Sequence, residues 1–187
     1  RDLFINNSIS QGIGVAEAEK AFDESDIVSA MSYYRKAAEA GYVPAQIRLA
    51  YLLDKSEENE EAFGWYQTAA ATGDAEAEHG LARMYASGDG VTKNNSEALR
   101  LFTSSATKNY TPAIRVMAVA YEQGELGLRI DYETAQKWLA KGVQLNDYWS
   151  IKRLARAYSN GELGLRIDRQ KATQLEQQLA RLNTDSD

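Results

Sequence analysis

Residues 77–109 read AEHGLARMYASGDGVTKNNSEALRLFTSSATKN, and this stretch carries the pattern that decides the fold. An alanine, Ala98, stands three positions before an apolar pair, and Asn109 closes the frame. The frame recurs at intervals of 32, 36, 37 and 37 residues, with its first apolar residue at Tyr33, Trp65, Leu101, Trp138 and Leu175. The preceding alanine is present every time, at Ala30, Ala62, Ala98, Ala135 and Ala172. Agreement in five consecutive frames indicates an internal repeat.

A second segment follows the Gly or Asn that closes a frame. Small or apolar residues fill offsets 4, 8, 9 and 12 of this segment, as in Ala113, Met117, Ala118 and Tyr121 after Asn109. These offsets lie on one face of a helix. Each repeat is therefore predicted to contain two helices, and we call this segment the A helix and the alanine frame the B helix.

Polar residues and glycines mark the ends of the predicted B helices. A side chain able to cap the helix stands four residues before the alanine of most frames, at Asp26, Asn94, Asp131 and Asp168. Residues that tolerate a left-handed backbone follow the helices, at Gly41, Gly73, Asn109, Asn146 and Asn183. Two of the glycine loops that join A to B read identically, Gly-Glu-Leu-Gly-Leu-Arg-Ile-Asp, at 124–131 and 161–168.

Composition excludes several classes of function. The 187 residues include no cysteine and one histidine, which excludes disulfide scaffolds and Cys/His zinc sites. The net charge of −6 opposes nonspecific binding to nucleic acid, and no run of about 18 apolar residues could span a membrane. No constellation of catalytic side chains is recognisable. The sequence therefore predicts a protein that is not an enzyme and has no cofactor, no metal and no nucleic-acid partner.

These residues resemble the SEL-one-like (Sel1-like) repeat, a relative of the tetratricopeptide repeat. Its pattern A-x-x-x-L-G-x-x-Y-x-x-G-x-G-V-x-x-D-x-x-x-A-x-x-W-Y-x-x-A-A-x-x-G is followed best from Ala77 to Asn109. The resemblance implies an all-α fold, a right-handed α–α superhelix (solenoid) of about five helix-turn-helix repeats. We expect one solenoid domain over 14–183, with repeats at 14–40, 41–72, 73–108, 109–145 and 146–183. Residues 1–13 are expected to form an N-terminal strap or edge, with a contact segment as the alternative, and 184–187 are expected to form a tail.

The resemblance also implies a biological context. Bacterial proteins of this kind often act in the periplasm or at the host interface, where they assemble secretion, exopolysaccharide-export or signalling machinery. A periplasmic or secreted bacterial location is therefore favoured over a cytoplasmic one. The cysteine-rich branch of the family is excluded because this chain contains no cysteine.

The exposed side of the A helices supplies the candidate binding residues. Offsets 3, 6 and 10 lie opposite the buried stripe, on the expected concave wall of the solenoid. With the adjacent Arg153, the partner-binding candidates on this concave face are Tyr51, His79, Arg83, Arg115, Trp149, Lys152, Arg153 and Arg156. A solvated helix face is the simpler interpretation of the same charges. His79 is not expected to bind a metal, because Arg83 beside it repels cations.

Other polar and aromatic residues have structural interpretations. Offset 6 also places Ile47 on the exposed face. Repeat-equivalent aromatic residues are predicted to lie in the core, at Trp65, Tyr85, Tyr121, Trp138 and Tyr158. A run of carboxylates is interpreted as a solvated acidic loop, at Glu57, Glu58, Glu60 and Glu61.

The sequence thus favours a non-enzymatic scaffold or adaptor that binds an acidic or amphipathic segment of another protein. The residues expected to pair with the partner's acidic groups are Arg83, Arg115, Lys152, Arg153 and Arg156, and Trp149 or Tyr51 would be the apolar anchor. Reversing Arg115, Lys152 and Arg156 to Glu is expected to abolish capture without changing the fold. The alternative is binding of an anionic polysaccharide or cell-wall glycan on Trp149, Tyr148 and the arginines, for example in an exopolysaccharide-export assembly. Glycan titration against Trp149→Ala would separate the two.

Overall fold

The structure, a computed structural model, describes residues 14–184. The predicted strap at 1–13 and residues 185–187 of the predicted tail lie outside the described residues. Thr184 is the last residue of the final helix.

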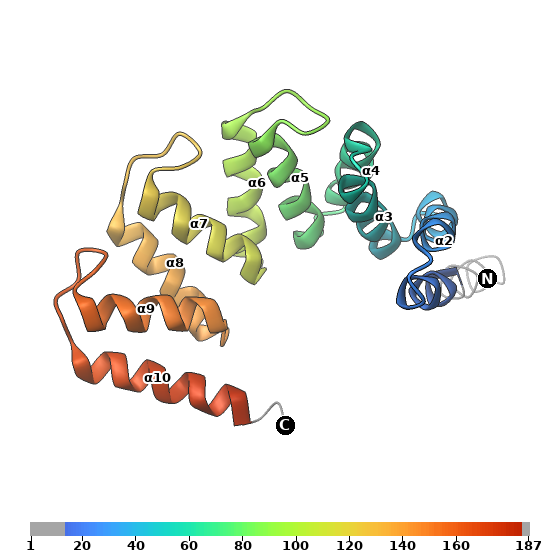
Figure 1. Ribbon diagram of the computed structural model, residues 1–187. Coiled ribbons are helices and arrows are strands. Elements are labelled where there is room, and N and C mark those ends of the chain that lie inside the picture. Colours follow the sequence, from blue (N-terminus) through green and yellow to red (C-terminus); the bar gives the residue numbers. More distant parts are fainter. Residues whose placement is uncertain (1–13, 185–187) are drawn as a thin grey trace, which may run out of the picture. The chain divides into compact units, whose positions relative to one another are not determined.

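Helices make up the repeats, and no strand occurs between residues 14 and 184. The described part of the first helix covers residues 14–23. The helices that follow are α2 (Ile27–Glu39), α3 (Val43–Lys55), α4 (Asn59–Ala70), α5 (Ala75–Ser87), α6 (Asn95–Thr107), α7 (Thr111–Gln123), α8 (Tyr132–Gln144), α9 (Tyr148–Asn160) and α10 (Arg169–Thr184) (Figure 1). The prediction of an all-α fold built from helix-turn-helix repeats is confirmed.

The chain forms two compact units, residues 1–94 and 95–187, which we call the N-terminal and C-terminal units. The helix of residues 14–23, α3, α5, α7 and α9 are A helices, and the even-numbered helices are B helices. Each named helix packs on the next within its unit, and α3 also contacts α5, the A helix of the following repeat. Stacking supplies the apolar wall that one helix pair lacks. The single domain predicted over 14–183 stays a prediction.

The residues that recur in the sequence form the core. All five alanines of the B helices are at most 3% exposed: Ala30, Ala62, Ala98, Ala135 and Ala172. The offset-8 residues of the A helices are buried as well: Leu49, Leu81, Met117 and Leu154. A methyl group at the alanine positions lets the neighbouring helix approach closely at crystal-like packing density.

Glycine extends this close approach at Gly80 in α5. A Cβ on Gly80 would lie 2.3 Å from Cε1 of Tyr66, whose side chain is buried in α4. Gly64 of α4 is the opposite case, because nothing lies within 4 Å of the Cβ that it lacks.

Left-handed residues end the helices where glycine or asparagine was expected, with φ of 86° at Gly41 and 69° at Asn109. In the two repeats without a glycine loop, Ser25 and Glu57 adopt φ of 63° and 64°, which the sequence did not indicate. The prediction for Asn183 is wrong, because α10 continues through this position to Thr184. The earlier left-handed residues turn the chain into the next helix, whereas Asn183 lies inside α10.

The predicted caps at Asp26, Asp131 and Asp168 are confirmed. Each carboxylate accepts a hydrogen bond from the backbone N–H three residues later, on Ser29, Thr134 and Lys171 respectively. These bonds satisfy donors that an uncapped helix start leaves open.

Two burial predictions need correction. The aromatic residues expected in the core are only half-buried: Trp65, Tyr85, Tyr121, Trp138 and Tyr158. In the first four B helices the second residue of the apolar pair lies deeper, and Tyr34 and Tyr66 are 3% exposed. Ile47, expected on the exposed face, is 6% exposed. Because α3 contacts α5 of the next repeat, a smaller part of the A-helix face is exposed than the offsets predict.

The close approach at Gly80 predicts opposite effects for two Gly→Ala substitutions. Gly80→Ala gains helix propensity but forces the buried Tyr66 ring to move, so we expect a net loss of about 1–2 kcal/mol in the free energy of unfolding. Gly64→Ala meets open space and should gain about 0.5–1 kcal/mol. Urea unfolding followed by circular dichroism measures both. Equal effects of the two substitutions would contradict the close packing of α4 on α5.

Candidate functional site

Arg115, one of the candidate binding residues, pairs with a buried carboxylate of the next repeat. Its Nε donates to Asp147 Oδ1 at 2.9 Å and to Oδ2 at 3.1 Å. Asp147 is the N-cap of α9 and also accepts from the backbone N–H and hydroxyl of Ser150. Burial raises the pKa of Asp147, but these hydrogen bonds outweigh it and hold the pKa below its usual value. Arg115 is thus engaged inside the chain.

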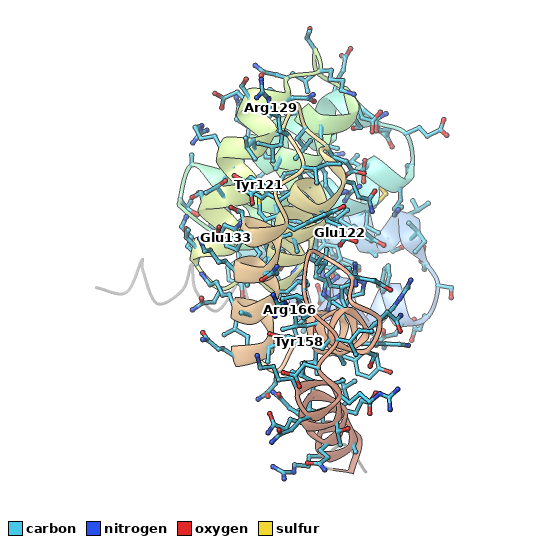
Figure 2. The ribbon with its side chains drawn as sticks, turned by 90° about the vertical axis from the view of Figure 1, so that its left-hand side faces the viewer. Tyr121, Glu122, Arg129, Glu133, Tyr158 and Arg166 are labelled. Atoms are coloured by element: carbon cyan, nitrogen blue, oxygen red, sulfur yellow. The ribbon has the colours of Figure 1, made fainter. Side chains whose placement is uncertain are left out.

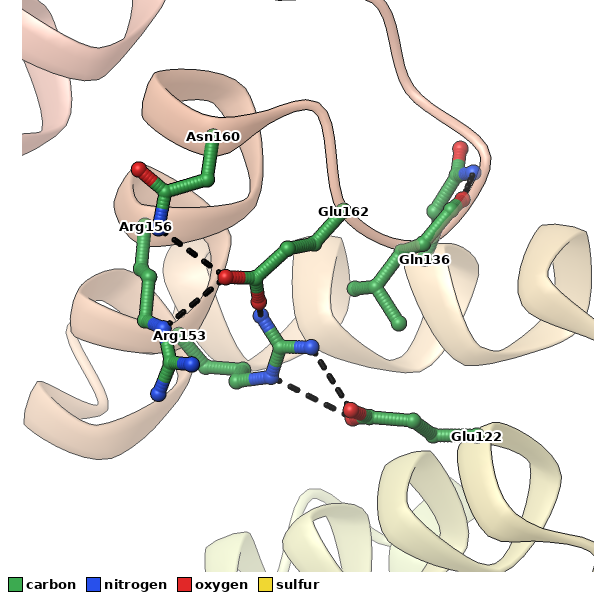
Figure 3. Close-up of polar contacts among 7 residues, drawn as sticks. Glu122, Gln136, Arg153, Arg156, Asn160 and Glu162 are labelled. Atoms are coloured by element: carbon green, nitrogen blue, oxygen red, sulfur yellow. Dashed lines mark hydrogen bonds and ion pairs between the residues drawn. The ribbon is translucent and has the colours of Figure 1, made fainter.

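Arg153 joins two acidic residues from different segments (Figure 3). Its Nη2 lies 2.6 Å from Oε1 of Glu122 in α7, and its Nη1 lies 2.8 Å from Oε2 of Glu162 in the following loop. Glu162 Oε1 accepts from Arg156 Nε at 3.0 Å and from Asn160 Nδ2 at 2.9 Å. The Arg153 side chain is 15% exposed. Burial lowers the pKa of Arg153, but the two carboxylates raise it by more than burial lowers it. The guanidinium of Arg153 therefore stays charged.

Arg83 and His79 lie on α5 in the N-terminal unit. Arg83 Nη2 is 3.1 Å from Asp54 Oδ2 of the preceding A helix. Burial and then the Arg83 charge lower the pKa of His79 to about 4, so the imidazole is neutral at pH 7. The predicted run of positive charge therefore does not include His79.

The remaining candidates differ in their surroundings. Trp149 is partly buried against the apolar cluster that contains Leu139 and Leu154. Lys152 is exposed, and its Nζ lies 5.7 Å from the centre of the Tyr148 ring. Tyr51 is 39% exposed.

The acidic run at 57–61 is only partly a loop. Glu60 and Glu61 lie in the first turn of α4, where carboxylates stabilise the helix N-terminus. Glu61 accepts hydrogen bonds from Arg35 of α2 and from Trp65 Nε1. The Arg35 hydrogen bond is the main reason that the pKa of Glu61 lies below its usual value.

Four ion pairs follow a common rule. Each joins an arginine to a carboxylate of a neighbouring repeat within one unit: Arg35–Glu61, Arg83–Asp54, Arg115–Asp147 and Arg153–Glu122. We call these four pairs the inter-repeat ion pairs. Three of the arginines that the sequence suggested for binding a partner, Arg83, Arg115 and Arg153, are paired in this way inside the chain.

A hollow surface occurs instead on the A helices of the N-terminal unit. Two adjoining cavities of about 250 and 290 Å³ share Glu19, Tyr34 and Arg48 in their walls. Their other lining residues come from the helix of residues 14–23, α3 and the start of α5: Val15, Phe22, Asp23, Pro44, Ile47, Tyr51, Leu52, Asp74 and Glu76. Three successive A helices thus contribute, and Tyr51 is the one predicted site residue among them. We call this surface the N-terminal groove.

The charges around the N-terminal groove are mainly negative. Among the described residues, Arg48 is the one cation that lines the groove, and none of these residues forms an ion pair with its exposed guanidinium. Asp74 caps α5 through the Ala77 N–H, whereas Glu19 and Glu76 are exposed. Burial, opposed by Arg48, raises the pKa of the Tyr34 hydroxyl, so the floor of the groove is a neutral phenol.

Sequence reasoning missed the contribution of the first helix. Glu19, Phe22 and Asp23 precede the first clear frame, so the repeat offsets did not reach them. Tyr34 was recognised as a frame residue, but the frame does not reveal that it lines both cavities. The A-helix offset did place Tyr51 on the exposed side.

Two further searches concern metal ions and membranes. Between residues 14 and 184, no three His, Asp or Glu side chains gather in a way that could hold a metal ion. None of the helices in this part of the chain combines the length and apolar character needed to cross a bilayer.

Comparison with protein families identifies five Sel1 repeats, at residues 18–42, 43–74, 75–110, 111–147 and 150–183. Among solved structures, a Sel1 repeat protein from Oxalobacter formigenes superposes with a TM-score of 0.77 at 24% identity, covering 89% of this chain and 69% of that one. This likeness concerns the fold.

Two curated relatives are named as regulators. The chitin synthase regulator of Saccharomyces cerevisiae is 29% identical over 119 residues, which cover 60% of this chain and 17% of the relative. The exopolysaccharide production negative regulator of Rhizobium leguminosarum is 33% identical over 95 residues, covering 44% and 36%. The chain spans between 17% and 36% of the length of the curated relatives it matches.

The inter-repeat ion pairs predict that Arg115→Ala destabilises the fold. The substitution leaves the Asp147 side chain, 2% exposed, without its cationic partner, so we expect a loss of about 2 kcal/mol in the free energy of unfolding. Arg115→Glu should be worse, which revises the expectation that charge reversal there leaves the fold unchanged. Arg100→Ala is the matched control, because its exposed pair with Glu97 on the same helix contributes less than about 1 kcal/mol. Similar losses in chemical denaturation would contradict a role for the buried carboxylate.

His79 predicts a pH dependence between pH 6.5 and 4. Its pKa lies near 4 in the folded chain and at the ordinary histidine value of about 6.5 when unfolded, so the unfolded state takes up a proton first. Stability is fully present above pH 6.5 and falls as the pH drops, by up to about 3 kcal/mol. Urea unfolding of the wild type and of His79→Gln at pH 7, 6 and 5 measures this, and His79→Gln should lose the slope. A wild type equally stable at pH 7 and pH 5 would rule the effect out.

Proposed function

Because the chain belongs to the Sel1 repeat family, we propose that it is a non-catalytic scaffold that binds a partner protein segment on its A helices. Sel1 repeat proteins generally mediate protein–protein interactions and are generally non-catalytic. The observation that carries the proposal is the N-terminal groove, where three successive A helices surround two adjoining cavities. Repeat proteins commonly bind on surfaces that several repeats build together.

The chemistry of the groove favours a particular partner. Phe22 and Tyr51 offer partly exposed apolar area beside the cavities. Glu19, Asp23 and Glu76 surround this area with negative charge, and Arg48 can donate to a main-chain carbonyl of a bound segment. We therefore propose an apolar anchor flanked by Lys or Arg. At the N-terminal groove, such a segment takes the place of the acidic one that the sequence favoured at Arg115, Arg153 and Arg156, because these three arginines are paired inside the chain.

The two named relatives support a regulatory use of such binding. One is named a chitin synthase regulator and the other an exopolysaccharide production negative regulator. A scaffold can regulate an assembly by holding or masking one component, with no reaction of its own. The periplasmic or secreted location stays a prediction.

Binding of a glycan is the alternative that the experiment below also tests. It depended on Trp149 and the neighbouring arginines, but Trp149 packs partly against the apolar cluster and both Arg153 and Arg156 contact Glu162.

A displayed library of random 12-residue peptides, selected on the whole chain, tests the groove. We expect enrichment of peptides with an aromatic or aliphatic residue beside Lys or Arg. Glu19→Lys should weaken these peptides at least about tenfold, because it places a cation against their basic residues. Affinity is measured by fluorescence anisotropy of the labelled peptides.

Glu17→Lys is the matched control, since Glu17 lies exposed on the same helix and does not line either cavity. It should leave the affinity nearly unchanged. Equal weakening by both variants would indicate general electrostatics and overturn the groove. Displacement of the peptides by alginate would favour the glycan alternative.

A further inference from the structure

The identical loops 124–131 and 161–168 are more alike than the helices around them. The A helices before them, 111–123 and 148–160, match at four of 13 aligned positions, and the B-helix stretches after them, 132–144 and 169–181, match at one. The loops match at all eight positions. A common origin of the two repeats explains the shared pattern, but it does not explain why only the loop stayed identical.

Some of the shared loop residues have a clear structural role. Gly124 and Gly161 end α7 and α9 with φ of 74° and 72°. Asp131 and Asp168 cap the next helix. Leu128 and Leu165 stand at the V position of the repeat pattern G-V-x-x-D, which is apolar in the family too. The two positions left open by that pattern hold Arg-Ile in both loops.

Arg129 and Arg166 have no such role. Both are exposed, and within the described residues neither guanidinium has an ion-pair or hydrogen-bond partner. Figure 2 shows both side chains on the C-terminal unit. An acidic chain thus presents the same unpaired cation in two successive repeats.

Ile130 and Ile167 are 58% and 62% exposed, among the most exposed large apolar residues of the described chain. Each isoleucine covers the glycine that starts its loop, where a Cβ would lie 3.3 Å from Cγ1. Any aliphatic side chain could make this contact. The remaining exposed area is available to a partner.

The second loop packs against the helix that follows the first loop. Gln136 Nε2 of α8 donates to the Leu163 carbonyl at 2.8 Å, so the second loop packs beside the start of α8. A Cβ on Gly164 would lie 3.6 Å from Tyr132 Cδ2, and Tyr132 directly follows the first loop. Tyr132 itself is 43% exposed. We call Arg129, Ile130, Tyr132, Arg166 and Ile167 the tandem-loop patch.

The carboxylates near the patch are mostly engaged. Glu162 contacts Arg153 and Arg156, and Glu133 binds Lys137 at 2.7 Å. Glu125 is exposed, because Val116 and Val119 stand where Arg153 and Arg156 lie one repeat later. Within the two loops, Glu125, Arg129 and Arg166 are therefore the charges left for a partner.

We propose that the tandem-loop patch binds an acidic, amphipathic protein segment that places two carboxylate groups on the two arginines and apolar side chains on the isoleucines. Charge complementarity selects the acidic residues, and the aliphatic area favours a protein over a hydrated uronate chain. The inference goes beyond the N-terminal groove and does not depend on it, because the two surfaces favour peptides of opposite charge.

The peptide selection described above also tests this patch. We expect a second class of enriched peptides that are acidic and contain aliphatic residues. Arg129→Glu or Arg166→Glu alone should weaken them about tenfold, and the double variant should abolish measurable binding. Ile130→Thr with Ile167→Thr should weaken them as well, which bulk charge alone cannot explain.

Lys93→Glu is the matched control. Lys93 is an exposed cation in the glycine loop of the N-terminal unit, at the position equivalent to Ile130, and its reversal should leave the acidic peptides bound. Glu19→Lys should also leave them bound, so failure of the groove and of the patch are distinguishable. Circular dichroism and thermal unfolding verify that each variant is folded.

Three results would overturn the proposal. One is the absence of acidic peptides that depend on Arg129 and Arg166. Another is their displacement by alginate, which would make the occupant a glycan. The third is self-association of the wild type that the double variant abolishes in analytical ultracentrifugation, which would make the occupant a second copy.

Discussion

The close approach of neighbouring helices at small side chains is the constraint on which the repeats depend. Ala30, Ala62 and Ala98 are fully buried where the B helices pack, and at Gly80 even a methyl group would strike the Tyr66 ring. At this separation the larger side chains of both helices interdigitate without voids. Every surface of the protein is positioned by this packing, since the loops and exposed faces are what remains outside it.

Part of the charge in this chain holds neighbouring repeats together, and part stays unpaired on the described surface. Arg115 and Arg153 look like binding residues in the sequence, but each faces a carboxylate of an adjacent repeat. Buried or half-buried pairs of this kind tolerate loss of one partner poorly. Arg48, Arg129 and Arg166 lack such pairs within the described residues, and they lie beside exposed apolar area. Surfaces suited to recognition are therefore found where cations remain unmatched.

Much of the fold could be predicted from the sequence because the repeat is a local signal. Each signal acts within a few residues of where it occurs. These signals are the alanine three positions before the apolar pair, the capping aspartates, and the left-handed Asn109 and Asn146. The candidate site was harder, because Arg115 meets Asp147 from 32 residues away and no offset within one repeat reveals that pairing. The cavities likewise depend on how three helices meet, and Glu19 lies outside the recognisable frames.

The inter-repeat ion pairs also bear on modular engineering. Arg83 needs Asp54 before it, Arg115 needs Asp147 after it, and Arg153 needs Glu122 before it. A repeat moved to another position would carry an arginine or carboxylate without its ion-pair partner. The repeat next to its original place would keep the other, unpaired charge. The ion pairs therefore fix the order of the repeats. A repeat of this chain could be moved only together with the repeat that carries the other member of its ion pair.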